Sequence, residues 1–269
     1  MKGKLYTLIL VLVLLIGLSL MLYPVLSEYW NSFHQSKVIA SYVEQIDNLD
    51  EDDYEEILGA AKDYNANFKR DSLWILSDEE KVVYENLLNV AGNGMMGYIE
   101  IPSINCSLPI YHGTGGNVLQ VATGHLEGSS LPVGGESSHC IISGHRGLPS
   151  AKLFTNLDQL KEGDVFMLYV LNEAFAYEVD QIRIVEPDDL TNLRIEQGED
   201  LCTLVTCTPY AVNSHRLLVR GHRVETYEVS EVRVTADATQ LDDTMVAMVV
   251  AIPILLGMFI WLMVYYRKR

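Results

Sequence analysis

The strongest constraint on the fold of this chain is a pair of long hydrophobic segments, one near each end. Leu5–Leu26 contains 22 residues without a charge, and Thr244–Tyr266 contains 23. About 20 consecutive apolar residues in a helix cross the hydrocarbon core of a bilayer. The sequence therefore predicts a transmembrane anchor over residues 1–27 and a second anchor, with a basic tail, over residues 244–269.

The charges that flank these segments predict the orientation of the chain. Lys2 and Lys4 precede the first segment, and Arg-Lys-Arg at residues 267–269 follows the second. Lysine and arginine stay on the cytoplasmic side of membranes, so both termini are expected inside and residues 28–240 outside. No A-x-A cleavage site follows the first segment, which is also longer than the core of a signal peptide, so we expect it to be retained.

Composition argues against several classes of function. The formal net charge of −17 opposes binding to nucleic-acid phosphates. The chain contains no zinc-type C-x-x-C pair, P-loop or G-x-G-x-x-G motif, and the acidic run at residues 44–56 lacks the pattern of a calcium loop. We therefore expect no nucleic-acid partner, cofactor or metal. The four cysteines could form two disulfides or serve as small buried hydrophobes; they are Cys106, Cys140, Cys202 and Cys207.

Residues 28–96 are predicted to form a helical extension. Ser77-Asp-Glu-Glu80 is a capping box that opens one of its helices. The apolar side of that helix is expected to contain Val82, Val83, Leu87 and Leu88. The glycine-rich stretch at residues 92–97 then marks a boundary between domains.

Residues 97–228 differ in composition from the helical extension. They contain short runs of β-branched and aromatic residues, separated by Gly, Pro, Asn or Asp. Several short strands at this spacing favour a mainly β fold, either a barrel or a sandwich. A linker at residues 229–243 is expected to connect this domain to the second anchor.

One stretch of the β domain suggests chemistry. In "TLVTCTPYAVNSHRLLVRGHR", from Thr203 to Arg223, Pro209 and a polar loop separate two strand-like runs. If the two runs are antiparallel neighbours, Cys207 and Arg216 flank the loop with their Cβ atoms about 5 Å apart. A guanidinium is a permanent cation that can stabilise a thiolate or an oxyanion. These residues therefore predict either a nucleophilic cysteine with an arginine partner or one more buried thiol.

A cysteine nucleophile also needs a proton carrier, most often a histidine. His145 follows the apolar run "CIIS", and strand ends commonly present side chains to a cleft. His125, in "TGHLEG", is the alternative. Spacing and periodicity leave the choice between them open.

Together these stretches resemble the sortases, cysteine transpeptidases of Gram-positive cell surfaces. "TLVTC" is similar to the T-L-x-T-C motif of that family, and "TCTPYAVNSHRLLVRGHR", "GHLEGSSLPVGG" and "SGHRGLP" resemble its class C, or pilin-polymerising, branch. The resemblance covers residues 97–225 and the layout of two anchors. It implies a closed β-barrel of about eight strands.

The resemblance also implies roles for individual residues. It makes Cys207 the nucleophile, His145 the proton carrier, Arg216 the group that binds the substrate carbonyl or oxyanion, and Thr206 a substrate-binding residue. The implied reaction cleaves a sorting motif of the L-P-x-T-G type through a thioacyl enzyme and transfers it to a lysine of another pilin subunit. The catalytic domain is expected to act as a monomer.

Many class C sortases carry a lid with an Asp-Pro-aromatic motif. "RDSLW", at residues 70–74, departs from that motif because Ser72 replaces the proline and Leu73 stands where the ring belongs. Asp71 and Trp74 are therefore candidate lid residues, with Asp71 expected to contact Arg216. The alternative is that Asp71 caps a helix.

Three other functions are alternatives to pilin polymerisation. Two of them would use the same nucleophile, and the third would use none. A secreted cysteine protease would transfer the acyl group to water, and a housekeeping sortase would transfer it to peptidoglycan. A membrane-tethered scaffold of the pilus would need no nucleophile at all. An arginine where a protease has an Asn or Asp to orient its histidine argues against the first, and the two anchors argue against the second.

Overall fold

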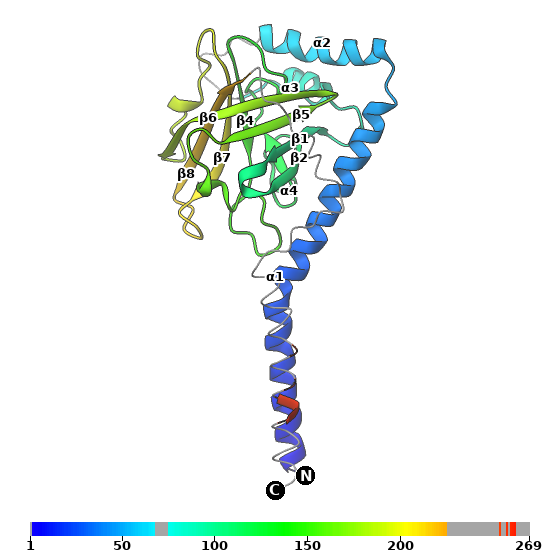
Figure 1. Cartoon of the computed structure of the whole chain (residues 1–269), viewed down its shortest axis with the longest axis vertical. Coiled ribbons are helices and arrows are strands. Elements are labelled where there is room, and N and C mark those ends of the chain that lie inside the picture. Colours follow the sequence, from blue (N-terminus) through cyan, green and yellow to red (C-terminus); the bar gives the residue numbers. More distant parts are fainter. Residues whose placement is uncertain (1, 68–74, 225–252, 254–256, 258, 262–269) are drawn as a thin grey trace. The chain divides into compact units, whose positions relative to one another are not determined.

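The structure is a computed structural model that describes residues 2–67, 75–224, 253, 257 and 259–261 (Figure 1). The chain divides into two compact units, Met1–Glu228 and Val229–Arg269, and the first contains every helix and strand described here from α1 to β8. The candidate lid residues Asp71 and Trp74, the predicted linker and most of the second hydrophobic segment lie outside the described residues.

The first hydrophobic segment continues without a break into the helical extension. Helix α1 runs from Lys2 to Asp47 with Pro24 inside it, and Figure 1 shows the helix changing direction partway along its length. Pro24 accounts for a bend because its ring removes a backbone hydrogen bond and crowds the preceding turn. Within the described residues one helix is long and apolar enough to cross a membrane, with a mean hydropathy of 2.1 over its most apolar window.

Two shorter helices complete the extension: α2 (Glu51–Asn67) and α3 (Asp78–Asn86). The capping box is confirmed, because the Ser77 hydroxyl accepts from the Glu80 amide and the Glu80 carboxylate accepts from the Ser77 amide. The predicted apolar side of α3 is wrong in part. Val82 and Val83 are 60% and 55% exposed, whereas Tyr84 and Leu88 are buried, because the barrel packs against the side of the helix that carries the tyrosine.

Eight strands form a closed barrel, as the resemblance implied (Figure 1). Their order around the barrel is β1-β2-β3-β4-β7-β8-β6-β5. Only β2 with β3 and β4 with β7 are parallel pairs; all other neighbours are antiparallel. The strands are β1 (Met95–Ile101), β2 (Cys106–His112), β3 (Thr123–His125), β4 (Ser138–Ser143), β5 (Val165–Val170), β6 (Glu173–Val185), β7 (Asp200–Thr208) and β8 (His215–Arg223).

Four short helical segments lie in the connections between strands. They are α4 (Gly116–Leu119) and three single turns of 3₁₀ helix, η1 (Pro102–Ile104), η2 (Leu157–Gln159) and η3 (Thr191–Leu193). The first strand begins at Met95, so the described barrel starts two residues before the predicted boundary at residue 97.

Strand alternation separates an inner face from an outer face. On β7 and β8, Cys202, Leu204, Leu217 and Val219 point into the main core. Each large aliphatic side chain buried there contributes about 1.5–3 kcal/mol of transfer free energy. A second, smaller apolar cluster on the outer face contains Ile141, Leu193 and Leu218. All four cysteines are free thiols, so the two-disulfide alternative does not hold in this structure.

Candidate active site

Cys207 and Arg216 are direct partners across the antiparallel pair of β7 and β8. They form the second-to-last pair before the connecting loop, as the predicted hairpin required. Both side chains are partly exposed and share the outward-facing parity of Val205 and Leu218. The loop turns through Pro209, whose carbonyl accepts from the amides of Val212 and Asn213.

The Arg216 guanidinium is held by backbone carbonyls of its own loop. Its Nη1 donates to the carbonyl oxygens of Asn213 at 3.3 Å and His215 at 3.1 Å. Within the described part of the chain it has no carboxylate partner. These two bonds hold the guanidinium at the end of β8 that pairs with Cys207.

His145 follows the strand that lies on the other side of β7. In the parallel pair of β4 and β7, Ser143 is opposite Val205, and the Gly144 amide donates to the Val205 carbonyl at 3.0 Å. His145 is the next residue, so its loop begins beside the end of β7 that carries Cys207. The His145 carbonyl accepts from the Phe154 amide at 3.1 Å, which holds the backbone of the loop. Cys207 and Arg216 thus face each other on β7 and β8, and His145 lies in the loop that follows β4. We call His145, Cys207 and Arg216 the candidate row.

The side chain of Thr206 connects β7 to the backbone that follows β4 and does not point to the same face as Cys207. Its side chain is 2% exposed, and its hydroxyl donates to the Gly144 carbonyl at 2.8 Å. This bond ties the residue before Cys207 to the residue before His145. A role for Thr206 in substrate binding remains a prediction.

The alternative histidine belongs to the interior. His125 is fully buried; its Nδ1 lies 2.9 Å from the Tyr84 hydroxyl and its Nε2 lies 2.8 Å from the Ser130 carbonyl. Both ring nitrogens are therefore occupied. His125 is thus held away from the outer face, and the assignment of His145 as the proton carrier stays a prediction.

Sequence reasoning missed Arg146, the residue after His145. Its side chain is only 9% exposed and forms an ion pair with Asp158. Its Nη1 lies 3.5 Å from the Thr208 hydroxyl, and its guanidinium lies 5.8 Å from the centre of the Tyr210 ring. One buried cation thus connects the histidine loop, the end of β7 and η2. The only signal in the sequence was a charged residue inside an otherwise apolar and glycine-rich turn.

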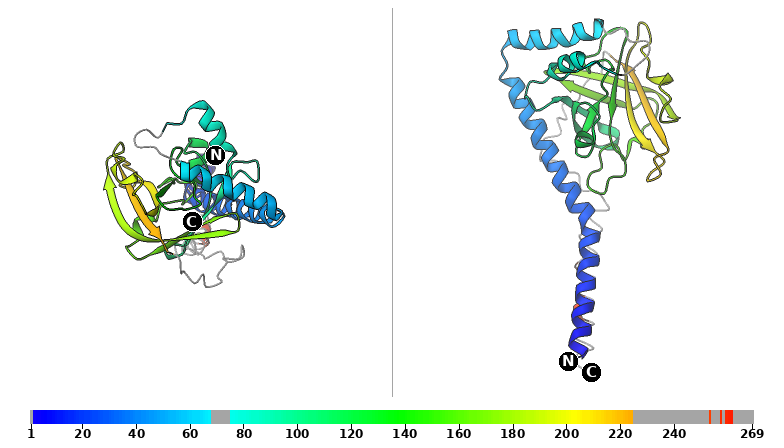
Figure 2. Two further views of the ribbon diagram at one scale, coloured as in Figure 1. Left: turned by 90° about the horizontal axis from the view of Figure 1, so that it is seen from above. Right: turned by 180° about the vertical axis from the view of Figure 1, so that it is seen from behind.

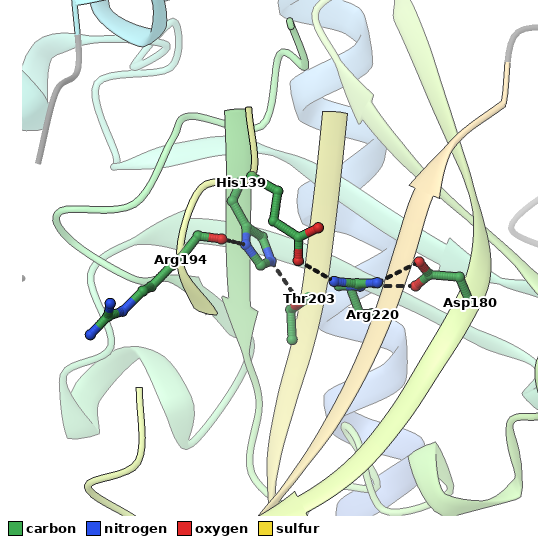
Figure 3. Close-up of polar contacts among 6 residues, drawn as sticks. His139, Asp180, Arg194, Thr203 and Arg220 are labelled. Carbon is green, nitrogen blue, oxygen red and sulfur yellow. Dashed lines mark hydrogen bonds and ion pairs between the residues drawn. The ribbon is translucent and has the colours of Figure 1, made fainter. Parts of the chain in front are cut away.

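A polar network fixes the loop between β6 and β7 to the same outer face, farther from the row (Figure 3). Arg220 donates to both carboxylate oxygens of Asp180, at 3.0 and 2.7 Å, and to Glu196 at 2.6 Å. The hydrogen bond with Asp180 is the main reason that the pKa of Arg220 is raised. Leu193, in the same loop, packs in the outer apolar cluster with Ile141 and Leu218.

His139 supplies the other half of this network. Its Nδ1 lies 2.8 Å from the Arg194 carbonyl and its Nε2 lies 2.7 Å from the Thr203 hydroxyl (Figure 3). Burial lowers the pKa of His139, so the neutral ring donates to the carbonyl and accepts from the hydroxyl. The network holds the loop between β6 and β7 against the outer face of β4, β7 and β8. Among the described residues no three His, Cys, Asp or Glu side chains come together as a metal site.

Comparisons with known proteins agree with this fold. The sequence pattern described as "Sortase domain" matches residues 99–224. Sortase D of Bacillus subtilis is 31% identical over 131 residues, which are 48% of this chain and 63% of that protein, so the chain spans less than two thirds of that relative's length. Sortase A of Bacillus anthracis is 30% identical over 155 residues, covering 55% of this chain and 71% of that protein.

Solved structures give higher identities. Sortase C1 of Streptococcus agalactiae is 54% identical with a TM-score of 0.69, and the match covers 71% of this chain and 100% of that one. Sortase C of Streptococcus pneumoniae is 44% identical with a TM-score of 0.64, and the match covers 71% of this chain and 97% of that one. The pneumococcal structure is described as giving insights into catalysis and pilin substrate specificity in that protein.

Proposed function

This chain belongs to the sortase family of cysteine transpeptidases, and we propose that it is a membrane-anchored class C member that polymerises pilin subunits. It would cleave a sorting motif of the L-P-x-T-G type and transfer the acyl group to a lysine amine of the next subunit. The observation that carries this proposal is the direct pairing of Cys207 with Arg216 across β7 and β8, with the loop of His145 hydrogen-bonded to β7 through Gly144. Identities of 54% and 44% to the two sortase C structures support the class.

The first half of the proposed reaction forms a thioester. The Cys207 sulfur attacks the threonine carbonyl carbon, and the carbonyl oxygen becomes an oxyanion beside Arg216. A preorganised cation at that position stabilises charge that develops in the transition state. His145, as imidazolium, then gives its proton to the departing glycine amine as the threonine–glycine bond breaks.

The second half resolves the thioester. The neutral lysine amine of another pilin attacks the thioester carbon, and His145, now neutral, accepts the proton that the amine loses. The carbon–sulfur bond breaks, the cysteine thiolate leaves, and an isopeptide bond remains. The enzyme returns to its starting protonation state, so no cofactor is required.

We further propose that the catalytic domain lies outside the cell membrane with both termini in the cytoplasm. The apolar first half of α1 and the flanking lysines Lys2 and Lys4 support the first anchor. The second anchor rests on the uncharged segment Thr244–Tyr266 and its basic tail. The lid, with Asp71 on Arg216, stays a proposal that rests on the "RDSLW" stretch alone.

The test uses the full chain in detergent micelles with purified pilins that carry an L-P-x-T-G-type motif. Wild type and Cys106→Ala should both form ladders of covalent pilin oligomers, whereas Cys207→Ala should form none. A hydrolysed acid as the only product, even with an added amine, would indicate a protease. Transfer to peptidoglycan fragments but never to pilin would indicate a housekeeping sortase, and ladders that persist with Cys207→Ala would indicate a scaffold.

A further inference from the structure

Helix α1 joins the predicted membrane span to the barrel through contacts that follow each other along the helix. The Ser27 hydroxyl and the Asn31 amide both donate to the Ser150 carbonyl, at 3.1 and 2.6 Å. The Gln35 amide donates to the Val121 carbonyl at 2.7 Å. Farther along, the buried Tyr42 hydroxyl donates to the Met96 carbonyl at 2.8 Å. The position along α1 of the residue that makes each contact therefore gives the height of that part of the barrel above the predicted span.

The lowest of these contacts is made by the histidine loop. Ser27 and Asn31 follow Leu26, the last residue of the uncharged segment, by one and five residues. At 1.5 Å per residue, Asn31 lies within about 8 Å of the end of that segment. The headgroup layer on each side of the hydrocarbon core is about 5–8 Å thick. Ser150, which follows His145 by five residues, is thus held at the level of the headgroups.

The exposed aromatic residues of α1 occur at the same height. Tyr29, Trp30 and Phe33 are 56%, 63% and 46% exposed. At 100° per residue, Tyr29 and Phe33 lie on the side of the helix opposite to Ser27 and Asn31, and Trp30 lies to one side of it. All three are exposed, so the barrel does not cover them. Tryptophan and tyrosine concentrate at the two interfaces of a membrane, because one end of each ring is apolar and the other polar. These residues mark the headgroup layer independently of the length of the span.

The opposite end of the barrel is held far from the membrane. Asn65 of α2 donates to the carbonyls of Leu131 and Gly134 at 3.0 and 3.1 Å, and this connection precedes β4. Figures 1 and 2 show the loops that follow β4 and β7 at the end of the barrel nearer to the apolar half of α1. The row of His145, Cys207 and Arg216 lies at that same end, since it occupies the carboxyl ends of the two parallel strands.

We infer that the end of the barrel that carries the row, with the loop at residues 147–152, rests in the outer headgroup layer of the membrane. The partner of this surface is the phospholipid bilayer, because the surface is continuous with the apolar span on α1. The inference rests on the proposed anchoring and deepens the proposed function. A site at this height favours a peptide bond that lies a few residues above the same membrane over the same bond on a released chain, because the anchored bond has the higher effective concentration.

The height is measured directly on the full chain in nanodiscs of phosphatidylglycerol and phosphatidylcholine. A bimane label is placed at Pro149→Cys or, as the matched control, at Glu136→Cys; both positions are exposed and lie at opposite ends of β4. The background replaces the partly exposed Cys106 and Cys207 with serine. Lipids with a spin label at the headgroup should quench the label at residue 149 at least several-fold more than the label at residue 136. Equal quenching at the two positions would overturn the inference.

A second experiment separates this inference from the proposed function. Seven helix-forming residues inserted between Leu26 and Ser27 raise the barrel by about 10 Å and leave its contacts with α1 in register. Cleavage of a soluble sorting peptide should stay within twofold of wild type. Processing of a substrate anchored in the same nanodisc should fall about tenfold, because its effective concentration at the site drops. Undiminished processing of the anchored substrate would overturn the inference, whereas a wild type that cleaves no peptide would overturn the proposed function and leave the quenching result standing.

Discussion

Two cysteines of β7 lie five residues apart and have opposite surroundings. Cys202 is completely buried in the main core, directly opposite Cys140 of β4. Cys207 is partly exposed on the outer face, directly opposite Arg216 of β8. Because five is an odd number, the two side chains point to opposite faces of the strand. Parity and distance from the strand end, rather than residue type, separate the structural thiol from the candidate nucleophile.

Replacing each cysteine with alanine tests this comparison most strongly. Cys207→Ala should lower transpeptidation at least about 10⁴-fold, because the thioester cannot form. Cys202→Ala should keep activity within a few-fold and reduce the free energy of unfolding by about 1–2 kcal/mol, since it leaves a small cavity in the core. Steady-state rates and urea unfolding curves measure the two effects. An inactive but fully stable Cys202→Ala would reverse the assignment.

Two arginines of β8 extend the comparison along one face. Arg216→Met should lower kcat about 10²–10³-fold with little change in stability, because the cation acts on the oxyanion. Arg220→Met should instead destabilise the fold by about 1–3 kcal/mol, since Asp180 loses its charged partner. Thermal unfolding and peptide cleavage by the two variants separate the roles. Equal losses of activity in both variants would mean that Arg216 has no catalytic role that Arg220 lacks.

Arg146 tests whether the row depends on its support. Arg146→Met should lower kcat about 10–100-fold at unchanged KM, because His145 is no longer held at its working distance from Cys207. Arg146→Lys should restore part of the rate through Asp158. The matched control is Arg223→Met, which removes a guanidinium 4.6 Å from the Phe175 ring centre at the other end of β8. If Arg223→Met lowers kcat as much as Arg146→Met does, the loss reflects a general loosening of the barrel and not the positioning of His145.

The smallest expected effect is the change of the free energy of unfolding with pH that His139 causes, on the same outer face but away from the row. Burial lowers the pKa of His139 below its ordinary value of 6.5, so the unfolded chain binds a proton there more readily than the folded one. The stability that this provides is complete above about pH 6.5 and is lost as the pH falls below it, by at most about 1.4 kcal/mol per pH unit. Urea unfolding at pH 5 and pH 7 should show a smaller difference for His139→Gln than for wild type. An unchanged difference would assign the dependence elsewhere, for instance to His112, whose pKa burial also lowers.

The sequence predicted what local patterns determine. Short alternating runs gave the strands, the capping box gave the start of α3, and the spacing of Cys207 and Arg216 gave the hairpin that pairs them. Each of these depends on neighbours in the chain. The resemblance to sortases then supplied the number of strands.

The remainder depends on contacts between distant segments. Local patterns left His145 and His125 open and the resemblance assigned His145; the parallel register of β4 on β7, which brings the His145 loop to the end of β7, is encoded by no local pattern. The buried face of α3 is set by Tyr84, which reaches His125 in the barrel. The side chain of Arg146 contacts Asp158 and Thr208, which are 12 and 62 residues away along the chain. Periodicity within one segment carries no information about such partners.

The closure of the barrel restricts how any peptide can be recognised. A closed sheet offers no unpaired strand edge, so an extended substrate cannot join it by the backbone pairing that many peptide-binding domains use. It must instead lie across the outer face and be read by side chains and loops. Selectivity between related motifs is therefore expected to change with the loop between β6 and β7, while β7 and β8 stay the same. Exchanging residues 186–199 between relatives is then expected to transfer substrate preference without changing Cys207 or Arg216.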